Sequence, residues 1–113
     1  MLFDYLKMAG NYDQRKVDNT VVNEVEVDTC SVSDSTQPYE TGVCSKHYNN
    51  NKWIIVEQYN TEQEAKIGHE KWVKIFENGL PDYLDDVSTC EMARFGGLAG
   101  SSEKGYNRYE KKL

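Results

Sequence analysis

The spacing of apolar and polar side chains between residues 20 and 59 predicts β-strands. Over residues 20–32, valines alternate with acidic residues, which is typical of a strand with one buried face and one wet, acidic face. The turn-forming sequence SDSTQP at 33–38 and three asparagines at 49–51 separate two further extended segments, residues 39–48 and 52–59. The pattern therefore predicts an antiparallel meander of about three strands.

A loop centred on Gln37 sets the register that we expect for the first hairpin. In that register Cys30 faces Cys44, and Asp28 faces Lys46 as a favourable pair of opposite charges. Both pairs depend on the position of the loop, because a shift of its centre changes every partner.

A helical pattern follows the last strand. Apolar residues between positions 65 and 76 recur at the spacing of one helical face, and Thr61 with Glu64 fits a capping box before them. Gly79 fits the end of the helix. Gly68, in the middle of the helix, indicates that a strand passes close to the helix backbone.

These elements predict a single α+β domain over residues 1–96. Its small antiparallel sheet of about three strands is packed by one long helix, and short terminal helices are expected at residues 2–9 and 88–95. Residues 80–87 are interpreted as a connector or one short helical turn. Residues 97–113 are predicted to form a flexible, Gly- and Ser-rich C-terminal tail.

Composition narrows the classes of function. The chain has 113 residues, a net charge of −6 and a sequence pI of about 4.9, and this acidity argues against direct binding to the phosphate backbone of nucleic acid. Eight tyrosines supply amphipathic contact area, which suits either a small core or an interaction surface. No segment has the pattern of a signal peptide or a membrane span, and three cysteines fit reduced thiols better than a disulfide framework.

The candidate catalytic and metal-binding groups lack specific spacing. His69 and Glu70 begin like the helical zinc-protease motif, but Val73 stands where that motif needs its second histidine. We therefore interpret His69 as a structural histidine beside the apolar face of the helix. The three cysteines, with His47 or His69, lack the close pairs that are typical of zinc sites. The sequence predicts no catalytic residue, no metal site and no cofactor.

Several segments resemble a group of short proteins encoded by tailed bacteriophages. They are DTCSVSDSTQPYETGV (28–43), KWIIVEQYNTEQEAKIGHEKWVKIF (52–76), DDVSTC (85–90) and, at the start, FDYLKMAGNYDQRKV (3–17). The resemblance spans about residues 3–90 of the chain. Because the group has no assigned activity, the resemblance implies a viral origin and no catalytic residues.

The resemblance and the lack of a catalytic motif favour a non-enzymatic binding or assembly protein. We expect it to act in the host cytoplasm or the virion by surface complementarity to a protein partner, either a second copy, a virion protein or a host factor. Neither a membrane nor nucleic acid is an expected partner. Besides the tail, the predicted contact residues lie on the acidic strand face and around the hairpin: Glu24, Glu26, Asp28, Asp34, Gln37, Tyr39, Glu40 and His47.

Two alternatives follow from the same residues. One is an inhibitor of a host defence system, either an acidic mimic of nucleic acid or a binder of a nucleotide signal. The other is a small hydrolase that uses Asp28, Asp34 and His47, with or without a metal ion. A mimic requires acidic side chains on one continuous exposed surface. An enzyme requires a histidine within hydrogen-bond reach of a carboxylate or thiol in a cleft.

Overall fold

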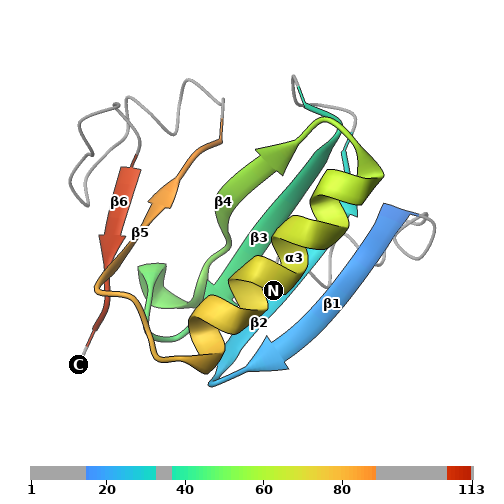
Figure 1. Ribbon diagram of the computed structural model, residues 1–113. Coiled ribbons are helices and arrows are strands. Elements are labelled where there is room, and N and C mark those ends of the chain that lie inside the picture. The colour runs from blue at the N-terminus through green and yellow to red at the C-terminus, as the bar shows by residue number, and fades with distance from the viewer. Residues whose placement is uncertain (1–14, 33–36, 89–106, 113) are drawn as a thin grey trace.

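The computed structural model describes residues 15–32, 37–88 and 107–112, and it has the α+β fold that the sequence predicts (Figure 1). A four-stranded antiparallel sheet has the strand order β1-β2-β3-β4, and the helix α3 lies across one of its faces. A second, two-stranded sheet pairs β5 with β6. The elements are β1 (Lys16–Val22), β2 (Val25–Ser31), β3 (Tyr39–Ser45), the single turn η1 (Asn49–Asn51), β4 (Ile54–Tyr59), α3 (Glu62–Glu77), β5 (Tyr83–Asp86) and β6 (Asn107–Glu110).

The prediction of one strand over residues 20–32 is wrong, because a tight turn divides this segment into β1 and β2. Asn23 and Glu24 both have positive φ, 49° and 65°, as a two-residue hairpin loop of the primed type requires. The Asn23 side chain donates to the carbonyl oxygen of Phe76 at 2.6 Å and so ties the turn to the end of α3. Val22 pairs with Val25 across the turn, which places Val21 on the face opposite to Val25.

The predicted register of the next hairpin is also wrong. Cys30 lies opposite Glu40, and Cys44 lies opposite Glu26, so the two thiols do not face each other. The loop is centred nearer to residue 35, because the backbone N–H of Val32 donates to the carbonyl oxygen of Pro38. This register places Thr29 directly opposite Thr41, on the face that packs against α3.

Helix α3 begins and ends where its capping residues predict. The Thr61 hydroxyl accepts from the backbone N–H of Glu64 at 3.1 Å, and Gly79, just after the helix, has a φ of 128°. The neighbour that explains Gly68 is a side chain and not a strand backbone. A Cβ atom on Gly68 would lie 2.2 Å from the hydroxyl oxygen of Tyr59.

The hydrophobic core lies between α3 and the sheet and extends toward β5. Its buried members come from the sheet, the turn after β3, the end of α3 and β5: Val25, Val27, Val43, Tyr48, Ile54, Val56, Phe76 and Leu84. The Tyr48 hydroxyl donates to the carbonyl oxygen of Pro81 at 2.5 Å, which fixes the segment that leads from the helix to β5.

The segment predicted as a connector contains strand β5, and residues 107–110 of the predicted tail form its partner β6. Arg108 binds the carboxylate of Asp85 through two nitrogens, at 2.9 and 3.3 Å. The backbone N–H of Val87 donates to the carbonyl oxygen of Ile55 at 2.7 Å, so the small sheet is joined to β4. The described part of the tail, residues 107–112, therefore belongs to the folded unit.

Two predictions concern residues that the structure does not describe. The short helix at residues 2–9 lies wholly outside the described ranges, and the one at 88–95 does so apart from Ser88. The domain boundary after residue 96 lies outside them as well, and it stays a prediction.

Candidate functional site

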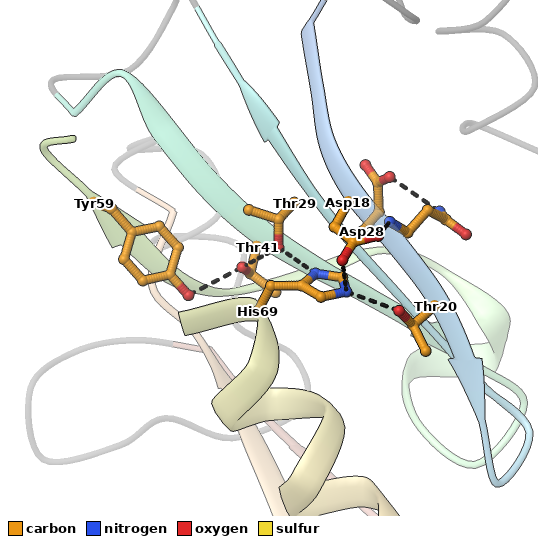
Figure 2. A network of polar contacts seen from close by, with 8 residues as sticks. Asp18, Thr20, Asp28, Thr29, Thr41, Tyr59 and His69 are labelled. Carbon is orange, nitrogen blue, oxygen red and sulfur yellow. Dashed lines mark hydrogen bonds and ion pairs between the residues drawn. The ribbon is translucent and has the colours of Figure 1, made fainter. Parts of the chain in front are cut away.

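A buried histidine stands at the centre of a polar network between α3 and the sheet (Figure 2). His69 projects from α3 toward the strands and is 1% exposed. Its Nδ1 lies 2.7 Å from the hydroxyl oxygen of Thr29 on β2. Its Nε2 lies 2.9 Å from the hydroxyl oxygen of Thr20 on β1. Both ring nitrogens are therefore occupied by threonine hydroxyls, which accounts for a fully buried histidine as the sequence predicts.

The network continues across the sheet from Thr29 to a carboxylate on β4. The hydroxyl oxygens of Thr29 and Thr41 are 2.6 Å apart, and Thr41 lies 3.0 Å from the hydroxyl of Tyr59. The Tyr59 hydroxyl donates to Glu57 Oε1 at 3.1 Å. Continuous hydrogen bonds thus connect His69 to Glu57 through Thr29, Thr41 and Tyr59.

The Glu57 carboxylate is held in its ionised form by three donors. Burial alone would raise the pKa of Glu57, but hydrogen bonds from Lys71, Trp72 and Tyr59 together lower it below its ordinary value. Lys71 Nζ lies 2.5 Å and Trp72 Nε1 2.9 Å from Glu57 Oε1. An ionised carboxylate can only accept hydrogen bonds, so this end of the network fixes the direction of the others.

The direction set at Glu57 determines the tautomer of His69. Each hydroxyl has one hydrogen to donate. Tyr59 gives its hydrogen to Glu57, so Thr41 donates to Tyr59 and Thr29 donates to Thr41. Thr29 then has only its acceptor lone pairs for the imidazole, and His69 must carry its proton on Nδ1. Its Nε2 is consequently an acceptor.

The electrostatics of the site favour a neutral imidazole. Burial lowers the pKa of His69, and the carboxylates of Asp18, Asp28 and Glu70 oppose this without cancelling it. Asp18 Oδ2 lies 3.8 Å from Nε2, which is too far for a hydrogen bond. As a neutral group with both nitrogens engaged, His69 is interpreted as a structural element.

An open groove lies beside this network, between β1 and α3. It has a volume of about 290 Å³ and is lined by Val17, Asp18, Lys66, Ile67 and Glu70. We call it the β1–α3 groove. Val17 occupies the irregular position where the pairing of β1 with β2 shifts register, and Ile67 is 64% exposed on the outer side of the helix. Asp18 belongs both to the groove and to the surroundings of His69.

Three of the predicted contact residues do not form one exposed acidic face. Glu24 lies in the turn after β1, where Lys46 at 2.6 Å and then His47 at 3.2 Å lower its pKa through hydrogen bonds. Glu26 and Asp28 share the side-chain amide of Asn19, which donates to each carboxylate at 3.0 Å. Because Asp28 is only 4% exposed, β2 does not offer the continuous acidic surface that a nucleic-acid mimic requires.

The other predicted contact residues are spread along one hairpin and its continuation. Gln37 donates to the side chain of Asn60 at 3.5 Å, and Tyr39 pairs with Tyr59 across the sheet. Glu40 lies opposite both Cys30 on β2 and Gln58 on β4: these pairs come from the two neighbouring ladders. Asp34 lies outside the described residues.

Of the three groups proposed for a hydrolase, the structure describes Asp28 and His47, and it does not bring these two together. Asp28 lies opposite Gly42 in the middle of the sheet, whereas His47 follows the end of β3 and pairs with Glu24 at an exposed turn. Burial, with the charges of Asp28 and Glu40, raises the pKa of the Cys30 thiol to about 12. Within the described ranges, no group of three or more His, Cys, Asp or Glu side chains is arranged to hold a metal ion.

The sequence pattern did not predict the hydroxyl residues that make up the network, namely Thr20, Thr29, Thr41 and Tyr59, or the carboxylate of Glu57. A signal was present, since threonines stand at alternate positions with the buried valines of β2 and β3. Reading that signal required the correct register, which puts Thr29 and Thr41 side by side.

Comparisons with known proteins were made at three levels. No protein-family model, no curated protein and no solved structure gave a significant match to the chain. No helix in the described part of the chain is long and apolar enough to cross a membrane. The surfaces and contacts of the chain itself are therefore the basis for a proposal of function.

Proposed function

We propose that the chain is a non-enzymatic binding or assembly protein of a bacteriophage that acts through protein–protein contacts in the host cytoplasm or the virion. The phage origin rests on the resemblance carried by residues 3–90. The binding role rests on one observation, the exposed apolar side chains beside the terminal strand of the sheet. Val21 on β1 is 70% exposed and Ile67 on α3 is 64% exposed.

These two side chains flank the same margin of the fold. β1 is the terminal strand of the four-stranded sheet, and Ile67 lines the groove that separates α3 from β1. Val21 lies on the face of β1 away from the helix, because it is offset by one residue from Val22. A partner that covers this margin buries both side chains at once, and this removes their apolar surface from water.

The backbone of β1 is protected against simple strand addition. In a hairpin with a two-residue loop, Val22 and Val25 exchange hydrogen bonds, so the peptide groups of Asn19 and Val21 point outward. The N–H of Asn19 is already taken by Asp18 Oδ1 at 2.8 Å. The register shift next to Val17 adds an irregularity to the same edge. Recognition at this margin is therefore assigned to side chains.

The state of the two histidines supports a role outside catalysis. His69 is buried with both ring nitrogens bonded to threonines, and His47 forms an exposed pair with Glu24. Neither histidine lines the β1–α3 groove. A general base must reach a substrate proton directly or through one water, and both ring nitrogens of His69 are already engaged.

The test is capture of the partner from host cells infected with the phage that encodes the chain, together with mass spectrometry of purified particles. The test variant is Ile67→Lys and the matched control is Gln63→Lys, since both place one new positive charge on an exposed position of α3. We expect one partner to be enriched by the wild type and the control, and its recovery to fall about tenfold for Ile67→Lys.

Two results would contradict the proposal. The first is that the wild type enriches no protein and is absent from particles. The second is that Ile67→Lys retains the partner as well as Gln63→Lys does. Circular dichroism of both variants checks that the fold is intact, because a charge on an exposed helical position should leave it unchanged.

A further inference from the structure

We propose that the β1–α3 groove binds a basic side chain, arginine or lysine, of a protein partner. The inference rests on the proposed function and names the group that the binding surface recognises. Three features of the groove carry it: an apolar lining for a long side chain, two carboxylates that no lysine or arginine of the described ranges pairs with, and a volume that fits one side chain.

The apolar lining comes from two elements that face each other across the groove. Val17 on β1 and Ile67 on α3 both line it. Arginine and lysine bury the methylene groups of their side chains on such surfaces while the charged end stays in contact with water. The volume of about 290 Å³ is at the small end of the range for ligand pockets, which suits one side chain better than a nucleotide.

The charges of the groove select a cation. The Asp18 side chain is 54% exposed, and its closest basic group, His69, is neutral. Among the residues that the structure describes, no lysine or arginine forms an ion pair with Asp18 or Glu70. The lysine of the groove, Lys66, is directed to Glu62, with its Nζ 3.8 Å from Oε2. Within the described part of the chain, the groove therefore offers two negative charges that no lysine or arginine pairs with.

The geometry of the groove also indicates which kind of cation it binds. Asp18 and Glu70 stand on different elements and flank apolar walls, an arrangement that suits a side chain with a long stem. A bound anion would be repelled by both carboxylates. A planar guanidinium, with five donors, can bind carboxylates from two directions, so arginine is the preferred occupant over lysine.

Binding of a cation in the groove should change the pKa of His69. Carboxylates from every element around it, Asp18 on β1, Asp28 on β2 and Glu70 on α3, oppose the lowering of the His69 pKa by burial. A guanidinium bound between Asp18 and Glu70 offsets two of these charges. The pKa of His69 therefore falls further when the groove is filled, which gives a readout inside the fold.

The experiment is an NMR titration of the ¹⁵N-labelled protein with N-acetyl-arginine amide. The neutral analogue N-acetyl-citrulline amide has nearly the same shape and serves as the ligand control. We expect saturable shifts of the amide signals of residues 17–18 and 66–70 with the arginine compound, and much smaller shifts with citrulline. The His69 signal should titrate at lower pH in the presence of the arginine compound.

Matched variants separate the groove from the overall charge of the protein. Asp18→Asn with Glu70→Gln removes two charges in the groove, and Glu77→Gln with Glu110→Gln removes two exposed charges elsewhere. We expect the first double variant to bind the arginine compound about threefold more weakly or worse, and the second to bind it like the wild type. Equal binding by the groove variant, or equal shifts with citrulline, would overturn the inference.

Failure of this inference can be told from failure of the proposed function. If the arginine compound does not bind but Ile67→Lys still loses its partner in infected cells, the protein-binding role stands and the groove takes another group. If the compound binds the groove but no partner is captured and the chain is absent from particles, the recognition chemistry stands and the assembly role is wrong.

Discussion

The contact between α3 and the sheet divides into two halves of different chemistry. Toward the end of the helix, Phe76 packs among Val25, Ile54 and other buried apolar residues. Near its middle, His69 belongs to the hydrogen-bonded network that runs through Thr29 and Thr41 to Tyr59 on β4 (Figure 2). The network ends on Glu57. The contact between α3 and the sheet therefore has an apolar half and a polar half.

The apolar half and the polar half contribute differently to the fold: one stabilises it and the other specifies the alignment of helix and sheet. Apolar contacts are not directional, so Phe76 and Ile54 can exchange neighbours at modest cost. A buried hydroxyl or imidazole without a partner costs about 1–3 kcal/mol, so the polar half is favourable only in one alignment of helix and strands. We infer that the apolar half supplies most of the free energy of unfolding and the polar half fixes the register.

Removing the anchor of the apolar half should have the largest effect. Phe76→Ala removes a fully buried ring and is expected to lower the free energy of unfolding by about 3–5 kcal/mol. Ile67→Ala on the exposed side of the same helix is the control and should change it by less than about 0.5 kcal/mol. Urea denaturation measures both, and a loss below about 1 kcal/mol for Phe76→Ala would contradict the assignment.

Gly68→Ala should destabilise the protein, although in the interior of a helix alanine is more favourable than glycine by about 1 kcal/mol. The new Cβ would lie 2.2 Å from the Tyr59 hydroxyl and 2.3 Å from two ring carbons, so the ring must leave its place beside Thr41 and Glu57. We expect a net loss of about 1–3 kcal/mol in urea denaturation. A gain in stability would show that the polar half tolerates displacement of Tyr59.

A first substitution at the centre of the network should lower the free energy of unfolding more than a second substitution beside it does. Thr41→Val leaves the Thr29 hydroxyl and the Tyr59 hydroxyl each without one partner, at an expected cost of about 1–3 kcal/mol. Adding Thr29→Val to that variant should cost less than Thr29→Val costs in the wild type, because the bond between the two hydroxyls is already gone. Additive losses in this double-mutant cycle would contradict a connected network.

The stability of the protein should fall as the pH is lowered below about 6.5, the ordinary pKa of histidine. The folded state has a lowered pKa at His69, so below about pH 6.5 the unfolded state binds more protons than the folded state does. The loss continues until the pH reaches the folded-state pKa, with a slope of at most about 1.4 kcal/mol per pH unit for this one group.

The control for the pH effect is His69→Gln, studied over the same range of pH. This variant keeps His47 and should lose the part of the slope that His69 contributes, although it is less stable at every pH. An unchanged slope in His69→Gln would assign the effect to other groups. Unfolding free energies from urea denaturation at several pH values between about 5 and 8 provide the measurement.

The parts of the fold that depend on neighbouring residues could be predicted from the sequence. Thr61, Glu64 and Gly79 determine the ends of α3 through local contacts, and the structure confirms the helix between them. The turn at Asn23 and Glu24 was missed because it lacks the glycine that usually marks a two-residue hairpin loop. The unrecognised turn joined β1 and β2 into one predicted strand.

The candidate site could not be predicted, because it depends on contacts between distant residues. Thr29 and Thr41 meet only in the observed register, and the sequence-based loop centre displaced every partner. The hydrogen bond between His69 and Thr29 joins residues that are 40 positions apart in the chain. β6 was likewise missed, since its pairing with β5 is not encoded in the local pattern of residues 107–110.

The most direct test of the account is the position of the proton on His69. Long-range ¹H–¹⁵N correlation NMR at about pH 7.5, above the ordinary pKa of histidine, distinguishes a ring nitrogen that carries hydrogen from one that does not. The directional network that ends on Glu57 predicts a neutral ring with hydrogen on Nδ1 and none on Nε2. A proton on Nε2 alone, or on both nitrogens, would contradict it.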